Sequence, residues 1–281
     1  MNIEFIFGVT SRFIAGLVLT FFFSTAHGQS IHISHCMAGG PISADTSSDI
    51  VVRHLYVAKI NHDNGLADWL AYRVLRESIG VASLLPRWWQ RDELLPSVLI
   101  LETDPNQPLY EQFDLGDAQD RDYRVTEVVF TPEDRVRLAP LTSFADTPFW
   151  EELNNLSNMS PLPSDLGAGA WSRLEQAINE LAALEGELYI VSGPLFEALG
   201  SDLVNLRADS PVAPSGYFKV VATLTDYAAF IFASDLPIHA HYCEQIAEID
   251  SIQELSGLTL FPNRENELLP GLFSALRCQY P

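Results

Sequence analysis

The chain has 281 residues, 47% hydrophobic and 19% charged, a composition typical of globular proteins that excludes disordered, collagen-like and coiled-coil classes. It carries 16 Lys and Arg against 37 Asp and Glu, so the formal net charge is −21. Because binding to the phosphate backbone depends on Lys and Arg, this balance argues against a nucleic-acid-binding protein.

The N-terminus predicts a cleaved signal peptide. An apolar run, Phe13–Ser24, follows a basic residue, and the small residues Ala26 and Gly28 have the spacing of a cleavage site after Gly28. An uncleaved membrane anchor is the alternative, but the run is shorter than the roughly 18 apolar residues that a spanning helix needs. We therefore expect residues 1–28 to be removed, leaving one secreted or periplasmic domain over residues 30–281 with no membrane segment.

Apolar runs rich in Val, Ile, Phe and Tyr predict strands. They lie at Ala67–Leu75, Val125–Phe130, Leu188–Ser192, Tyr217–Thr223 and Tyr227–Phe232. A short helix is the alternative for the first run, and the last two are close enough to form a hairpin. Between the first two runs, the proline-containing segment Pro86–Asp122 predicts a long surface loop.

A helix is predicted over Ala170–Leu184, where apolar residues recur at helical spacing and Gly186 follows as a stop signal. With the strands, it indicates a mixed α+β domain. Glu175 conflicts with the pattern, because it lies about 40° from Trp171 on the apolar face. An ion pair at the edge of the core is the simpler interpretation, and a metal-binding or catalytic carboxylate is the alternative.

Three cysteines are present, and an exported chain is expected to pair at least two of them. We expect the pair to be Cys243 with Cys278, which would hold the C-terminus and stabilise the fold by roughly 3 to 4 kcal/mol in the chain-entropy model. Cys36 is then either free or paired with another molecule.

The strings DRVRLAPLTSF, NNLSNMSPLPSDLGAGAWSRLE and LYIVSGPLFE, between residues 134 and 197, resemble the DNA/RNA non-specific endonucleases, also called ββα-metal or His-Me finger nucleases. The similarity extends to IVVRHLYVAK, DWLAYRV, GYFKV, YAAFIF and the two C-terminal cysteines. It implies a central, mostly antiparallel sheet flanked by helices. It also implies Mg²⁺-assisted hydrolysis of phosphodiester bonds, with nucleic acid as the partner.

The positions that carry the family's chemistry differ in this chain. The family motif Asp-Arg-Gly-His supplies the general base, whereas this chain has Asp134-Arg135-Val136-Arg137. Arg137 therefore stands at the base position, but Arg stays protonated and has no lone pair to accept a proton. Gly167 stands where the family has its metal-binding Asn and offers only backbone groups. The resemblance therefore implies that Mg²⁺ is absent or weakly bound here.

Other family positions are retained. Asn158 matches an active-site Asn and Glu175 an acid near the metal, while Arg135 and Arg87 match substrate-binding arginines. Turn bonding is the alternative for Asn158, and a surface ion pair is the alternative for either arginine. We expect Arg137 and Arg173 to complete a basic cleft, with Gly167 and Glu175 near Arg137. Asn179 stands where the family helix often carries a phosphate-binding Arg. His239 and His241 are expected to be exposed rather than a metal pair.

These observations leave three hypotheses. We favour a pseudonuclease, an exported domain whose cleft still binds a phosphate, a carboxylate or a protein partner, because both the base and the metal ligand are replaced. The alternative is a divergent, active Mg²⁺-dependent endonuclease that recruits Glu175 or Asp134, and divalent-metal binding would separate the two. A third hypothesis is an interaction protein whose acidic surface mimics nucleic acid, which charge clustering on one face would indicate.

Overall fold

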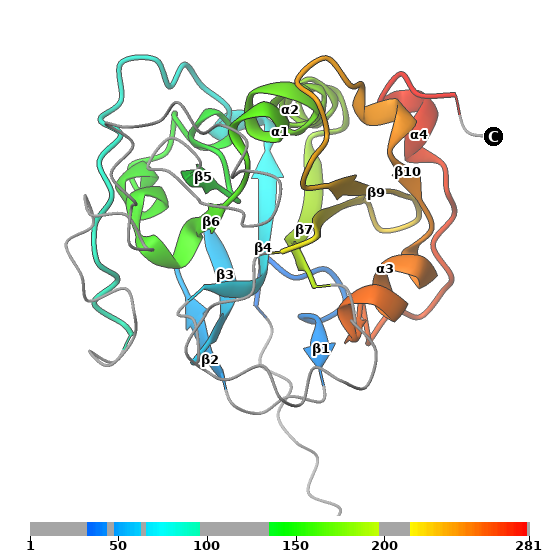
Figure 1. The fold of residues 1–281 in the computed structure, drawn as a ribbon, viewed down its shortest axis with the longest axis horizontal. Coiled ribbons are helices and arrows are strands. Elements are labelled where there is room, and N and C mark those ends of the chain that lie inside the picture. The colour runs from blue at the N-terminus through cyan, green and yellow to red at the C-terminus, as the bar shows by residue number, and fades with distance from the viewer. Residues whose placement is uncertain (1–32, 44–47, 63–65, 96–134, 197–213, 280–281) are drawn as a thin grey trace, which may run out of the picture. The chain divides into compact units, whose positions relative to one another are not determined.

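An antiparallel sheet organises the computed structural model, which describes residues 33–43, 48–62, 66–95, 135–196 and 214–279 (Figure 1). Its strand order is β10-β9-β8-β7-β4-β3-β2, and every neighbouring pair is antiparallel. The strands are β2 (Ser48–Val52), β3 (Tyr56–Asn61), β4 (Ala67–Leu75), β7 (Glu187–Leu195), β8 (Gly216–Ala222), β9 (Tyr227–Ala233) and β10 (Ile246–Ala247).

The described part of the chain also contains smaller strands and helices. Two short antiparallel pairs are formed by β1 (Ile42–Ser43) with β11 (Leu258–Thr259), and by β5 (Arg135–Arg137) with β6 (Met159–Pro161). The helices are α1 (Ser164–Leu166), α2 (Ser172–Glu185), α3 (Ile249–Ser256) and α4 (Leu272–Ala275). Residues His32–Pro281 form one compact unit, whereas the predicted signal peptide lies outside the described residues.

The predicted strands are confirmed where the structure describes them. β4 has the predicted bounds, β7 is longer than its prediction, and β8 and β9 pair as the expected hairpin. The hairpin turn closes through the Thr223 amide, which donates to the Asp226 carbonyl at 2.8 Å. The predicted strand Val125–Phe130 lies outside the described residues.

The predicted loop is described only over residues 86–95. This part contains no helix or strand beyond a bridge between Gln90 and Asn155, so its irregular backbone is confirmed. The predicted surface position of the loop is wrong for Asp92. This residue is 1% exposed, and its carboxylate accepts hydrogen bonds from Arg53 and Ser157. A buried carboxylate needs such partners.

The predicted helix is α2, and it begins two positions later than the periodicity indicated. A wider turn, Gly167–Trp171, precedes it, and Gly169 has a non-helical backbone there (φ −93°, ψ −116°). A Cβ at Gly169 would lie 2.7 Å from the Ile238 carbonyl oxygen, so only glycine fits. The helix ends at Gly186 (φ 93°), as predicted.

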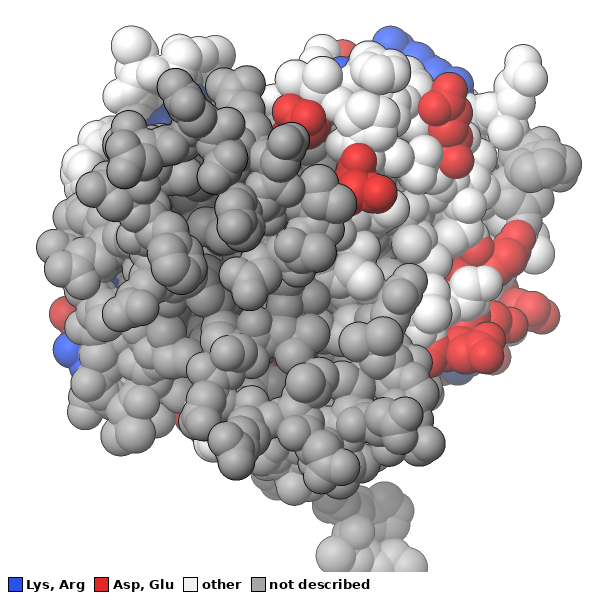
Figure 2. Space-filling model, viewed as in Figure 1, with Lys and Arg blue, Asp and Glu red and all other residues white. Residues whose placement is uncertain are grey.

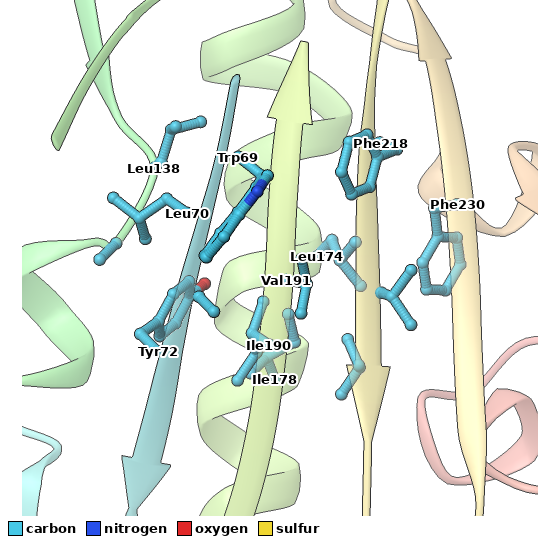
Figure 3. Packing of buried hydrophobic residues seen from close by; sticks show 14 of the residues in the cluster. Trp69, Leu70, Tyr72, Leu138, Leu174, Ile178, Ile190, Val191, Phe218 and Phe230 are labelled. Carbon is cyan, nitrogen blue, oxygen red and sulfur yellow. The ribbon is translucent and has the colours of Figure 1, made fainter. Parts of the chain in front are cut away.

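The core lies on both faces of the sheet. Leu174 and Ile178 of α2 pack near Tyr72 of β4 and Ile190 of β7 (Figure 3). Every residue of β8 is buried, so neither face of the central strands is open to solvent. α2 is therefore held against the sheet by its apolar stripe, and its polar side is available for the cleft described below.

The described helices include none long and apolar enough to cross a membrane. Acidic side chains are the more common charged groups on the described part of the face in Figure 2. Some stand apart in the upper part of the view, whereas several gather at its lower right edge.

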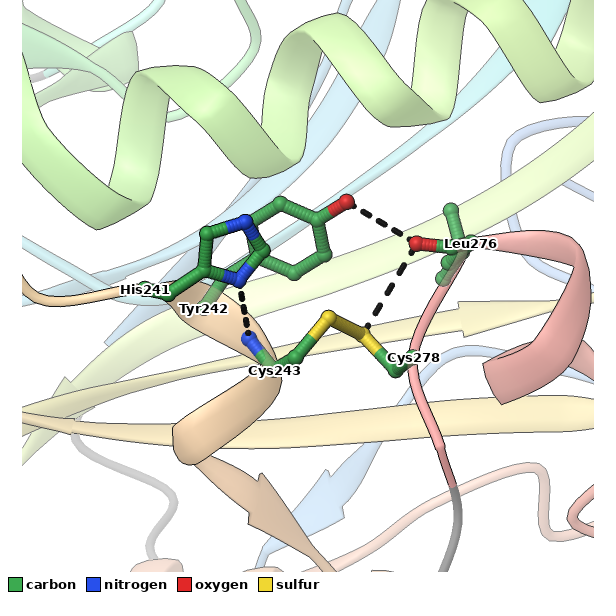
Figure 4. Close-up of a disulfide and its surroundings, with 5 residues drawn as sticks. All are labelled: His241, Tyr242, Cys243, Leu276 and Cys278. Atoms are coloured by element: carbon green, nitrogen blue, oxygen red, sulfur yellow. Dashed lines mark hydrogen bonds between the residues drawn. A yellow bond between two sulfur atoms is a disulfide. The ribbon is translucent and has the colours of Figure 1, made fainter.

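The disulfide between Cys243 and Cys278 is present, which confirms the predicted pairing (Figure 4). It joins the segment after α4 to the turn Tyr242–Glu244, and the Tyr242 hydroxyl also donates to the Leu276 carbonyl at 2.9 Å. Cys36 is free and buried, and burial raises the pKa of its thiol to about 12.

Replacing Gly40 with cysteine is expected to add a second disulfide, because a Cβ at Gly40 would lie 3.5 Å from the Cys36 sulfur. In the chain-entropy model so short a loop stabilises by about 2 kcal/mol. We expect the unfolded natural protein to show the free thiol of Cys36 and unfolded Gly40→Cys to show none. The midpoint of urea unfolding should be higher for Gly40→Cys. Gly40→Ala is the matched control without a thiol. Two titratable thiols after unfolding would contradict the prediction.

Candidate functional site

A cleft of about 520 Å³ opens between β5, the turn after β5 and the first half of α2. Within the described part of the chain, its lining carries three arginines and a single carboxylate, that of Glu175. The lining residues are Ala82, Arg87, Arg135, Val136, Arg137, Pro140, Leu141, Thr142, Ser172, Glu175, Gln176 and Asn179.

The pairing of β5 with β6 sets the direction of the arginines. Arg137 pairs with Met159 and Arg135 with Pro161, and alternate residues of a strand leave it on the same side. Both arginines line the cleft, and a methyl group of Val136 between them lies beside Gly167. Arg87 reaches the same cleft from the loop.

Arg137 is a partly buried cation that has few partners. Its Nη2 donates to Asn154 Oδ1 at 2.6 Å, and its guanidinium lies 4.3 Å from the centroid of the Trp89 ring. Its buried Nε has no acceptor, and no carboxylate pairs with it among the described residues. Burial, and to a smaller degree the charge of Arg87, lowers the pKa of Arg137 to about 10.

The loop fixes the partners of Arg137. Asn154 Nδ2 donates to the Pro86 carbonyl at 3.4 Å, and the Gln90 amide donates to the Asn154 carbonyl at 2.9 Å. These bonds hold residues 86–90 next to Asn154, so that Trp89 stacks on the guanidinium. The side chain of Arg137 is therefore held in place from two directions.

Glu175 forms the ion pair that the simpler interpretation predicted, with a lysine as its partner. Lys219 of β8 donates from Nζ to Glu175 Oε1 at 2.9 Å and lies 3.9 Å from the centroid of the Trp171 ring. Burial raises the pKa of Glu175, although Lys219 opposes this shift, and burial lowers the pKa of Lys219. Glu175 thus lines the cleft as a carboxylate that already has a counter-ion.

Asn158 has a structural environment. It is fully buried, its Oδ1 accepts from the Ala139 amide at 2.8 Å, and its Nδ2 donates to the carbonyls of Ala139 and Leu153. It is not among the lining residues of the cleft. These bonds correspond to the local-bonding alternative, and they hold the segment after β5 against the turn before β6.

The residues present do not fit a Mg²⁺ site. A Cβ at Gly167 would lie only 3.0 Å from Val136 Cγ2, so the position that the resemblance assigns to the metal ligand is both without a side chain and crowded. Mg²⁺ requires oxygen ligands in octahedral geometry. In the cleft, however, Glu175 is bonded to Lys219, and Asn179 Oδ1 accepts from Ser143 at 2.6 Å. The described residues hold no group of three or more His, Cys, Asp or Glu suited to a metal.

The expectation that Arg173 lines the cleft is wrong. Its Nη2 donates to the Ile238 carbonyl at 2.8 Å and to the Ala240 carbonyl. Arg173 and Glu175 are separated by about 200° around α2, so their side chains leave the helix on different sides. His241 Nδ1 accepts a hydrogen bond from the Cys243 amide at 3.2 Å. Asp134 lies outside the described residues.

Sequence reasoning missed Trp89, Asn154 and Lys219. The sequence did contain a signal for Lys219, because it is the one charged residue within the otherwise apolar strand GYFKVVA. Glu175 stands out in the same way as a charged residue on the apolar face of its helix. For Trp89 and Asn154 no local pattern points toward Arg137.

Residues 41–267 match the family model described as DNA/RNA non-specific endonuclease. A nuclease from Serratia marcescens is 30% identical over 250 residues, which cover 86% of this chain and 85% of that protein. Nuclease C1 from Cunninghamella echinulata var. echinulata is 23% identical over 250 residues, 83% of this chain and 90% of that protein. A chain in the crystal structure of the EndoG/EndoGI complex has the same fold, with a TM-score of 0.56 at 19% identity, covering 83% of this chain and 94% of that chain.

Proposed function

This chain belongs to the DNA/RNA non-specific endonuclease family, and we propose that it is a catalytically silent member whose cleft binds an anion without a metal ion. The resemblance places substitutions at the base and at the metal ligand of the family. Arg137 has no lone pair to activate water, and the loss of a general base typically costs about 10² to 10⁴ in rate. Gly167 has no side chain to bind a metal ion, and Val136 fills the space that such a side chain would need.

The observation that carries anion binding is the under-paired guanidinium of Arg137. A buried charge without a counter-ion is unfavourable, and the nearby charge of Arg87 adds to it. An anion in the cleft would supply the missing counter-charge through charge-assisted hydrogen bonds. The alternative, an active nuclease that recruits Glu175, is less favoured because Lys219 already occupies one of its oxygens.

Inorganic phosphate is expected to bind the purified mature protein in the presence of EDTA, measured by calorimetry. Binding should weaken at least tenfold in Arg137→Gln, because a hydrogen bond to a charged group contributes about 1.5 to 3 kcal/mol. Arg76→Gln removes an arginine outside the cleft lining and is the matched control. If phosphate binds the Arg137 variant as tightly as the natural protein, the cleft is not the site.

The pH dependence of phosphate binding follows from the same group. The guanidinium of Arg137 binds an anion in its protonated form, so affinity should fall as pH rises through its pKa of about 10. An ordinary arginine would keep its charge there. In Arg137→Gln we expect the decline near pH 10 to disappear. The same decline in that variant would contradict the assignment to Arg137.

We also propose that the protein is exported, with residues 1–28 as a signal peptide. The disulfide between Cys243 and Cys278 supports this, since disulfides persist mainly in oxidising compartments. Expression of the full chain in a host that secretes it should yield a mature protein beginning at Gln29, as measured by mass spectrometry. An intact N-terminus on a membrane-bound product would favour the anchor alternative.

A further inference from the structure

We propose that the ligand of the cleft is a small, hydroxyl-bearing phosphate monoester rather than a nucleic-acid polymer. This inference rests on the proposed anion-binding function and adds the size and chemistry of the ligand. The observations that carry it are the local charge, the number of arginines, the polar wall of the cleft and the rigidity of Arg137.

The charge of the cleft is opposite to the charge of the chain. Three of the 16 Lys and Arg line this one cleft, and the one carboxylate among its described lining residues, Glu175, is neutralised by Lys219. At physiological salt, charges are screened beyond about 8 Å. A small anion inside the cleft is therefore attracted by the arginines beside it. A polymer would extend over the rest of a chain whose formal charge is −21, and would be repelled there.

The arginines suit a phosphate better than a carboxylate. Arg135 and Arg137 project from the same side of β5, and Arg87 lies close enough for its charge to act on Arg137. A phosphate monoester presents three terminal oxygens and up to two negative charges, so the separate guanidinium groups of Arg137 and Arg87 can each donate to it. A carboxylate has only two oxygens and a single charge, and would leave part of this donor set unused.

The wall formed by α2 and the turn after β5 suits the rest of such a ligand. Thr142 and Gln176 place a hydroxyl and an amide along the cleft. Thr142 Oγ1 accepts from Asn179 Nδ2 at 3.1 Å and Gln176 Nε2 donates to Glu180 at 3.1 Å, which leaves the Thr142 hydroxyl hydrogen and the Gln176 carbonyl oxygen for a ligand. These groups can exchange hydrogen bonds with ligand hydroxyls. A volume of about 520 Å³ lies within the usual range of small-molecule sites, about 300 to 1,000 Å³.

Arg137 is prepared for this role by its surroundings. Asn154 and Trp89 hold the guanidinium before any ligand binds, so little side-chain entropy is lost when an anion arrives. Trp89 already stacks on the guanidinium of Arg137 and does not line the cleft, so its ring is not available to stack on a nucleotide base.

The test uses calorimetry with the mature protein in EDTA and 0.15 M salt. The probes are inorganic phosphate, glucose 6-phosphate, 5′-AMP, glucose and a single-stranded DNA 12-mer. We expect at least one of the two esters to bind at least tenfold more tightly than inorganic phosphate and than the 12-mer, and glucose not to bind. The two esters distinguish a sugar phosphate from a mononucleotide as the source of the shared chemistry.

Two sets of variants test the parts of the site separately. Arg87→Gln changes an exposed residue, so it should fold, and it should weaken every phosphate probe, whereas Arg76→Gln should not. Thr142→Val with Gln176→Met should reduce the advantage of the ester over inorganic phosphate at least threefold, without weakening inorganic phosphate. A wall that takes no part in binding would leave that ratio unchanged.

If the 12-mer binds as tightly as the esters, or if inorganic phosphate does, the small-ester inference is overturned while the proposed anion-binding function stands. If no phosphate probe binds, the proposed anion-binding function fails as well. If an ester binds best and the wall variants remove its advantage, the inference is supported.

Discussion

The triple variant Val136→Gly, Arg137→His and Gly167→Asn is expected to have much higher metal-dependent nuclease activity than the natural protein. Histidine would restore a group able to accept a proton near neutral pH, and a general base is worth about 10² to 10⁴ in rate. Asparagine would supply an oxygen donor at the position that the resemblance assigns to the metal ligand. We expect plasmid and RNA cleavage with Mg²⁺ or Mn²⁺ to rise at least 100-fold over the natural protein.

Val136 makes the third substitution necessary. Its Cγ2 lies 3.0 Å from where a Cβ at Gly167 would stand, so an asparagine there cannot be placed without moving Val136. The double variant Arg137→His with Gly167→Asn should therefore remain much less active than the triple variant. Val136→Gly alone is the matched control, and EDTA should abolish cleavage by the triple variant.

Two results would contradict this prediction. Metal-dependent cleavage by the natural protein at the rate of the triple variant, with contamination excluded, would mean that another residue serves as the base. Equal activity of the double and triple variants would mean that Val136 does not obstruct position 167. Mn²⁺ binding followed by electron paramagnetic resonance gives a readout that is independent of cleavage, and it should appear only when position 167 carries asparagine.

Lys219→Met is expected to destabilise the fold by about 3 to 5 kcal/mol, because it leaves the carboxylate of Glu175 without its counter-ion. Combining it with Glu175→Gln should recover most of the loss, since no unpaired charge then remains. Arg277→Gln, which breaks an exposed pair with Glu180, should cost less than about 1 kcal/mol. Urea unfolding of the four proteins measures these differences.

The deficit of Lys219→Met should also grow as pH rises. Burial already raises the pKa of Glu175, and the loss of Lys219 removes the group that opposes this shift. A carboxyl whose pKa is raised in the folded state stabilises the fold below its unfolded pKa, and this contribution is lost as pH rises through its folded pKa. The variant should therefore differ less from the natural protein at pH 5 than at pH 8. A deficit independent of pH, or one no larger than that of Arg277→Gln, would contradict the role of the pair.

The sequence by itself determined the elements whose pattern is local. The bounds of β4, the hairpin of β8 and β9 and the stop of α2 at Gly186 all follow from side-chain period and from turn residues within a few positions. Family resemblance added the substituted positions Arg137 and Gly167. The sequence also indicated that Glu175 needs a partner, because a lone acid on an apolar helix face cannot stay unpaired.

Only the tertiary structure decided which residues meet. Lys219 faces Glu175 because strand register places β8 beneath α2, and Val136 meets Gly167 because β5 packs beside the turn before α2. Trp89 and Asn154 reach Arg137 from separate segments, while Arg173, although near Glu175 in sequence, leaves α2 in another direction. Period and propensity act over a few residues, whereas these contacts depend on strand register and helix packing across the whole domain.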